Sequence, residues 1–178
     1  MKLLLLHNSY QQAGGEDKVV AMEAGMLRSA GHEVHLELVS NDSIAGFAGK
    51  VRTLLAAPHD PRRAAWMNEL LDRTGADLVH IHNFFPLLTP AVHEAAAGRG
   101  VPVVQTLHNY RLICAAATLM RDGAVCEKCL TGRSAAIVHR CYRGSLPGSA
   151  AVVAMQARAE RERTWQRSVT RFIALAEV

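Results

Sequence analysis

The side chains with the clearest capacity for chemistry are one histidine and the four cysteines that follow it. His108 comes directly after an apolar run, residues 101–107. A histidine at such a position can act as a general base near neutral pH, or donate a hydrogen bond to an anion or a hydroxyl group. A structural histidine bonded to a loop backbone is the alternative, and His108 alone does not decide between these roles.

The cysteines have the spacing of a metal site. They are Cys114, Cys126, Cys129 and Cys141, in the pattern C-x11-C-x2-C-x11-C, and they account for every cysteine in the chain. The central pair has the spacing of a metal knuckle, and four thiolates suit tetrahedral zinc. Such a zinc is structural, because four cysteine ligands close its coordination sphere and leave no position for catalysis. Two disulfides, free thiols or a redox pair are the alternatives.

Length and composition indicate a single domain over residues 1–178. Hydrophobic residues make up 49% of the 178 residues, which is enough for a substantial core. No apolar run is long enough to span a bilayer, and the first residues lack the apolar stretch and cleavage site of a secretory signal. We therefore expect a cytoplasmic protein, which could lie at the inner face of the membrane.

The charge is distributed unevenly along the chain. Residues 1–110 carry 9 Lys and Arg against 11 Asp and Glu, a net −2, whereas residues 111–178 carry 11 against 5, a net +6. A basic second part suits a phosphate, a nucleic acid or an anionic membrane surface, or it is simply a solvated arginine-rich helix. Aromatic residues make up only 5% of the chain and are not interleaved with basic residues, so nucleic acid is not an expected partner.

Short apolar strands alternate with helices along the chain. The predicted strands are 2–6, 33–39, 77–82, 102–107 and 171–175, and the predicted helices are 16–30, 43–57, 61–73, 89–97 and 149–167. This alternation predicts an α/β Rossmann-like fold, a parallel sheet with helices on both faces. The cysteine segment, about 111–145, is then an insert after the fourth strand. The first helix is expected to bury Val19, Met22, Met26 and Leu27.

Three of these strands end in polar clusters, which are His7, Asn8 and Tyr10, then His82 and Asn83, then His108, Asn109, Tyr110 and Arg111. Ligands of parallel sheets bind beyond the carboxyl ends of the strands, so these clusters predict one common site. A buried strand needs no polar residue at its end for its own stability.

Gly14 and Gly15 follow the first strand and open the first helix. Backbone amides at a helix start attract phosphate, and glycine lets a ligand come close to the backbone. The complete Gly-x-Gly-x-x-Gly pattern is missing, and Glu16 and Asp17 would cap the helix well without any ligand.

Four stretches in this order resemble the N-terminal domain of retaining glycosyltransferases of family 4, which have the GT-B fold. Residues 14–20 resemble the family's Gly-Gly-x-Glu-x-x-Val, and residues 77–82 its Asp-hydrophobic-hydrophobic-His-x-His strand. Residues 103–108 resemble its strand ending in Thr-x-His, and residues 171–175 the strand before the segment that leads to the second domain.

The resemblance implies the acceptor-side half of a hexosyltransferase of polysaccharide biosynthesis. A nucleotide-sugar would be the donor, and a glycan or a lipid-linked molecule the acceptor. Gly14 and Gly15 would contact the donor diphosphate, His108 would be the active-site histidine, and the polar clusters would face the acceptor. No metal is expected in the chemistry. The donor-binding C-terminal domain, with its Glu-x7-Glu motif, has no counterpart in this chain, so we expect residues 1–178 to be inactive alone.

The chain also departs from the family pattern. Asp17 stands where the family usually has Glu, and the cysteine segment is a subgroup feature. We expect zinc to fold that segment into a basic lid over the acceptor. A non-enzymatic, zinc-stabilised module that binds an anion is the alternative function.

Overall fold

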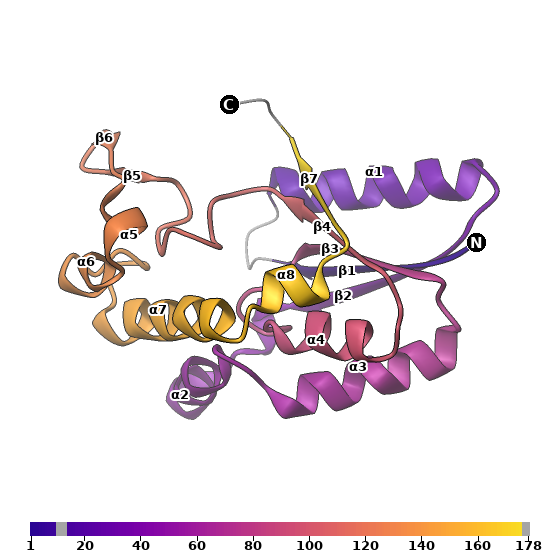
Figure 1. Cartoon of the computed structure of the whole chain (residues 1–178), viewed down its shortest axis with the longest axis horizontal. Helices are drawn as coiled ribbons and strands as arrows, with labels where there is room; N and C mark the ends of the chain where they lie inside the picture. The colour runs from indigo at the N-terminus through magenta and orange to yellow at the C-terminus, as the bar shows by residue number, and fades with distance from the viewer. Residues whose placement is uncertain (10–13, 176–178) are drawn as a thin grey trace.

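The computed structural model describes residues 1–9 and 14–175. A five-stranded sheet forms its centre, with all neighbouring strands parallel and in the order β2-β1-β3-β4-β7 (Figure 1). Its strands are β1 Lys2–Ser9, β2 Glu33–Ser40, β3 Leu78–Asn83, β4 Val103–Leu107 and β7 Arg171–Ala174. The Rossmann-like α/β fold predicted from the alternation of elements is confirmed.

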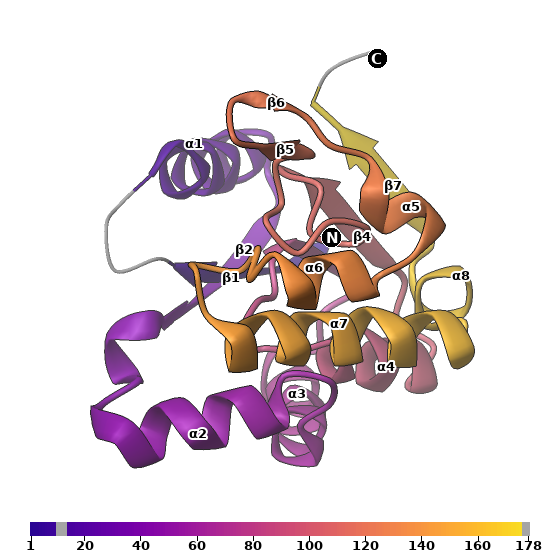
Figure 2. The ribbon, with the colours of Figure 1, turned by 90° about the vertical axis from the view of Figure 1, so that its left-hand side faces the viewer.

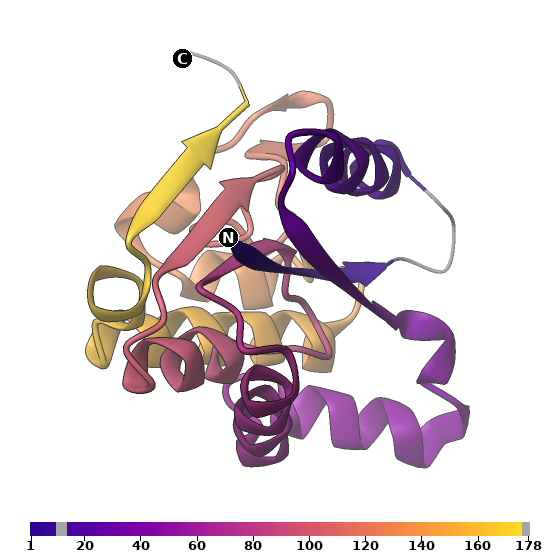
Figure 3. The same ribbon diagram turned by 90° about the vertical axis from the view of Figure 1, so that its right-hand side faces the viewer.

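Helices cover both faces of the sheet. They are α1 Gly15–Ser29, α2 Gly46–Ala56, α3 Pro61–Thr74, α4 Ala91–Gly98, α7 Leu146–Arg161 and α8 Thr164–Ser168, and a 3-10 turn, η1 Asn41–Ser43, precedes α2. In Figure 3, α1 lies above the sheet, and α3, α4 and α8 lie below it. None of the helices in the described ranges is long and apolar enough to cross a bilayer.

The alternation of side chains along the strands assigns a role to each face of the sheet. Val79 and Ile81 of β3 point into the main core beneath the sheet, with residues of α3, α4 and α7. His80 and His82 therefore point to the opposite face, toward α1. A small second core, built on Leu3, Leu5 and Ala24, occupies the amino-terminal part of that face. Its carboxyl-terminal part is polar.

The predicted helix signals around residue 60 are confirmed. Asp60 caps α3 by accepting a hydrogen bond from the Arg62 amide at 3.0 Å, and Pro61 occupies the first helical position. Gly75 ends the helix in the left-handed region, with φ of 58°.

The expected inner face of α1 is wrong for three of its four residues, and Leu27 alone packs, partly buried, against the second core. Val19, Met22 and Met26 are exposed, and the helix instead buries Val20 and Ala24 against the sheet. The periodicity misleads because the inner face of this helix also carries carboxylates that reach the polar part of the sheet.

The helix predicted over residues 149–167 is two helices. Helix α7 ends at Arg161, and Arg163 adopts a left-handed φ of 55° before α8 begins. Tertiary contacts hold this break, because the Thr164 hydroxyl donates to Glu94 at 2.7 Å and Trp165 packs on Phe84.

The segment between β4 and α7 contains only short elements, which are β5 Met120–Arg121, β6 Ala124–Val125, α5 Lys128–Thr131 and α6 Ser134–Val138. Figure 2 shows them in front of the carboxyl edge of the sheet, above α7. Helix α6 packs on α7.

Candidate functional site

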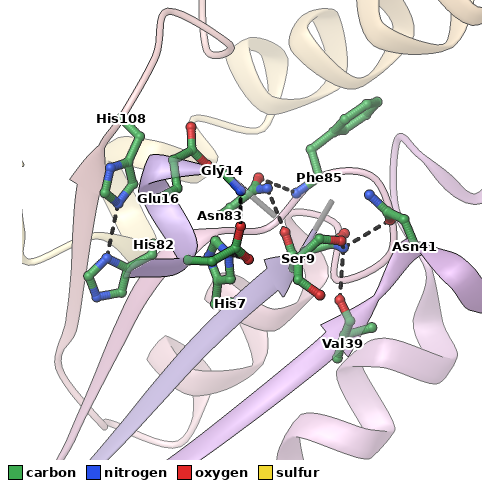
Figure 4. A network of polar contacts seen from close by, with 12 residues as sticks. His7, Ser9, Gly14, Glu16, Val39, Asn41, His82, Asn83, Phe85 and His108 are labelled. Carbon is green, nitrogen blue, oxygen red and sulfur yellow. Dashed lines mark hydrogen bonds and ion pairs between the residues drawn. The ribbon is translucent and has the colours of Figure 1, made fainter. Parts of the chain in front are cut away.

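Two histidines from neighbouring strands meet at the carboxyl edge of the sheet. His82 lies near the end of β3, and His108 directly follows β4. The Nδ1 atom of His82 lies 3.0 Å from Nε2 of His108, and the rings stack with centroids 5.3 Å apart (Figure 4). The prediction that these two strand ends share one site is therefore consistent with the geometry.

Glu23, from the inner face of α1, lies between two histidines of β3. Its Oε1 is 2.7 Å from Nδ1 of His80, and its Oε2 is 3.3 Å from Nε2 of His82. The second contact lacks hydrogen-bond alignment, so it is mainly electrostatic. His80 also bonds Thr106 Oγ1 through Nε2, at 2.7 Å. Sequence reasoning missed Glu23, because a glutamate in a helix is usually solvated.

The carboxylate determines which nitrogen of each ring carries a proton. An N–H facing Glu23 is favoured over a lone pair, which places protons on Nδ1 of His80 and Nε2 of His82. Nδ1 of His82 then accepts the N–H of His108 Nε2. The remaining nitrogen of His108, Nδ1, consequently carries a lone pair.

The pKa values support this assignment. Burial would raise the pKa of Glu23, but the hydrogen bond with His80 and the electrostatic attraction to His80 and His82 outweigh it and lower the pKa to about 2, so Glu23 stays ionised. Burial, together with the neighbouring His82 and His7, lowers the pKa of His108 to about 4. His108 is therefore neutral at pH 7.

The start of α1 is tied to the same site. Asp17 accepts a hydrogen bond from the Gly14 amide at 2.6 Å through Oδ2, and its Oδ1 lies 3.1 Å from Nε2 of the buried His7. Burial lowers the pKa of His7, although Asp17 opposes the shift. A Cβ added at Gly15 would meet no atom of residues 1–9 and 14–175 within 4 Å, so within this part of the chain the surface above the helix start is open.

The loop after β4 approaches α1 and the core. Asn109 donates to Glu16 at 3.1 Å and accepts from the Arg111 amide at 3.0 Å. The guanidinium of Arg111 lies over the rings of Phe85 and Tyr142, at 5.2 and 5.1 Å. Burial raises the pKa of Glu16. This loop is thus anchored on both sides of the site.

Asn8 and Asn83 hold the strand ends together. Asn8 donates to Val39 and Asn41, and Asn83 donates to the Asn8 carbonyl at 2.7 Å (Figure 4). Asn8 also accepts from the Leu87 amide at 2.8 Å. Their direct contact with an acceptor stays a prediction. Tyr110 is 42% exposed, and Tyr10 lies outside the described residues.

A family model for a glycosyl transferase 4-like domain matches residues 14–173. The chain belongs to the glycosyl transferase 4-like family. This confirms the resemblance seen in the strand ends and the glycine loop. A comparison with curated protein sequences finds no match.

The four cysteines of this glycosyl transferase 4-like domain are free thiols, of which Cys114 is buried. Burial raises the pKa of Cys129, and the thiols of Cys114 and Cys126 raise it further. The pKa of Cys141 is also raised, first by burial and then by the other three thiols. The backbone of Ala115 and Ala136 acts in the opposite direction and lowers the pKa of Cys129.

One cluster in the described residues has metal-ligand atoms within 4.8 Å of one another, and it is Glu23, His80 and His82. The cysteine sulfurs do not reach that spacing. Two imidazoles and a carboxylate are a donor set for a divalent cation. Glu23 is already bonded by His80, however, so the cluster is electrostatically complete without an ion.

Proposed function

We propose that this chain is the acceptor-side part of a retaining glycosyltransferase that moves a sugar from a nucleotide-sugar to a glycan or a lipid-linked acceptor. The observation that carries the proposal is the position of His108. It is held neutral by burial and by the neighbouring His82, at the edge of the sheet where, among the described residues, the start of α1 leaves open surface above Gly15.

The donor diphosphate fits the start of α1. The first amides of a helix lack intrahelical partners and, together with the helix dipole, favour a negative charge. No side chain that the structure describes covers Gly15, and Asp17 fixes the Gly14 backbone. Donors placed there stabilise the charge that develops as the diphosphate leaves.

His108 serves the sugar side of the transfer. The bond from the anomeric carbon to the diphosphate oxygen breaks, and the acceptor oxygen bonds to the same face of that carbon. With a pKa of about 4, His108 is a weak base, so its Nδ1 lone pair stabilises positive charge and orients a hydroxyl group. The acceptor proton leaves on the diphosphate, because phosphate groups titrate near about pH 6.

The proposal includes a second, donor-binding domain outside residues 1–178. Sites of this kind lie between two Rossmann-like domains, and a half-site supplies few donor contacts. We therefore expect residues 1–178 alone to be inactive and a longer protein with both domains to be active.

We also propose a structural zinc ion at Cys114, Cys126, Cys129 and Cys141. The donor set fits, and the backbone around Cys129 favours its thiolate form, which zinc requires. The sulfurs must move closer to reach ligand distance. Zinc would then fix the shape of the segment next to His108.

Incubation of the two-domain protein with a panel of nucleotide-sugars tests the function. We expect release of the nucleoside diphosphate and a product that keeps the anomeric configuration of the donor. Binding of phosphate-containing ligands without any turnover would instead support the anion-binding module.

A further inference from the structure

Helix α2 presents an apolar stripe to solvent. Phe47 is 83% exposed, Leu55 is 78% exposed and Val51 is 37% exposed, and their spacing of four residues places them on one face of the helix. No residue of α2 is fully buried. Large apolar side chains aligned in this way usually indicate a binding surface.

The charges around the stripe are positive. Lys50 and Arg52 lie on either side of it by helical geometry, and α2 contains no acidic residue. Arg52 also lines a surface pocket of about 330 Å³ together with Arg62 and Arg63. In the described parts of the chain, Arg62 pairs with Asp60, and no carboxylate forms an ion pair with Lys50, Arg52 or Arg63.

A second exposed apolar stripe lacks this charge pattern. Met22 and Met26 of α1 are 73% and 64% exposed. Helix α1 carries three carboxylates, Glu16, Asp17 and Glu23, against the two cations Lys18 and Arg28. An anionic surface would therefore attract α2 and not α1.

We propose that α2 docks on the surface of an anionic lipid bilayer. Phe47, Val51 and Leu55 enter the boundary between headgroups and acyl chains, while Lys50 and Arg52 contact the lipid phosphates. An amphipathic helix with cations on the flanks of its apolar face is the usual form of such a contact.

The position of α2 connects the docking surface with the site. The helix follows β2 at the carboxyl edge of the sheet, on the same side as the cysteine segment (Figure 2). A surface pocket of about 410 Å³ lies between Lys50 and Leu54 of α2 and Tyr142 and Arg143 at the end of that segment. Docking on a membrane favours a lipid-linked acceptor over a free glycan, and this choice of acceptor rests on the proposed function.

Sedimentation of residues 1–178 with vesicles tests the docking without donor or acceptor, so it is independent of transferase activity. One set of vesicles contains phosphatidylcholine alone, and the other about 30% phosphatidylglycerol. We expect binding to the anionic vesicles that is roughly tenfold stronger, and that is lost in about 0.5 M NaCl.

Two pairs of substitutions locate the contact. The double variant Phe47→Ser with Leu55→Ser should bind anionic vesicles roughly tenfold more weakly, and Lys50→Gln with Arg52→Gln should abolish the preference for anionic lipid. Met22→Ser with Met26→Ser is the matched control and should bind as the wild type does. All these side chains are exposed, so melting temperatures should not change. Absence of vesicle binding, binding that ignores the α2 variants, or loss of self-association in those variants without vesicle binding would overturn the proposal.

Discussion

His82 Nδ1 lies 3.0 Å from His108 Nε2, and the other nitrogen of His82 faces the carboxylate of Glu23. The imidazole of His82 therefore connects Glu23, in the middle of α1, with His108 at the end of β4. It determines the orientation and the tautomer of His108, so Glu23 is a positioning residue for the histidine that we place at the sugar.

Replacement of Glu23 by glutamine should reduce kcat about tenfold to 100-fold and leave KM little changed, because the His82 tautomer is no longer fixed. The measurement is the pH–rate profile of the two-domain enzyme, in which the acidic limb should shift. Glu69→Gln, on the exposed face of α3, is the control and should match the wild type. If the variant has a lower kcat but an unshifted pH–rate profile, Glu23 has only a structural role.

Acid should destabilise the fold through its buried histidines. Burial lowers the pKa of His93 to about 4, against 6.5 for the free side chain, so the unfolded state binds more protons between these values. Stability is therefore complete above about pH 6.5 and falls as the pH drops toward 4, by up to roughly 3 kcal/mol for this group. Denaturant unfolding between pH 7 and 4 measures how steeply the free energy of unfolding falls with pH. His93→Gln retains a donor for Gln105 and should make the free energy of unfolding less dependent on pH. An unchanged pH dependence would contradict the role given to His93.

Side chains at Gly15 should obstruct the donor without affecting the fold. A Cβ there meets no described atom within 4 Å, so Gly15→Val is expected to raise the KM for the nucleotide-sugar about tenfold or more, at an unchanged melting temperature. Gly25→Val is the matched control, since it lies on the same helix and also meets nothing within 4 Å. Equal effects of the two variants on KM would argue against phosphate contact at the helix start.

Zinc should be present in protein purified under reducing conditions. We expect about one zinc per chain by elemental analysis, and loss of the metal in Cys126→Ser. Chelation should lower the melting temperature by several degrees, because a structural zinc contributes folding free energy directly. The proposal of a structural zinc would be contradicted if the purified protein contained no zinc and Cys126→Ser left its stability unchanged.

The sequence was sufficient for the sheet and for part of the site. Alternation of strands and helices predicted the parallel sheet, and the rule that ligands bind at carboxyl ends brought His82 and His108 together. It could not identify Glu23, because only the angle of α1 on the sheet turns this residue inward. Nor could it show the break at Arg163, an ordinary helix former whose left-handed φ depends on the distant Glu94.

The most direct test of the account is sugar transfer by the two-domain enzyme with His108 replaced by alanine. Nucleoside diphosphate release should fall about 100-fold or more, while donor binding, measured by calorimetry, stays within about threefold of wild type. His32→Ala is the control, since His32 lies at the opposite, amino edge of the sheet. Full activity in His108→Ala would contradict the central claim that this histidine takes part in the transfer.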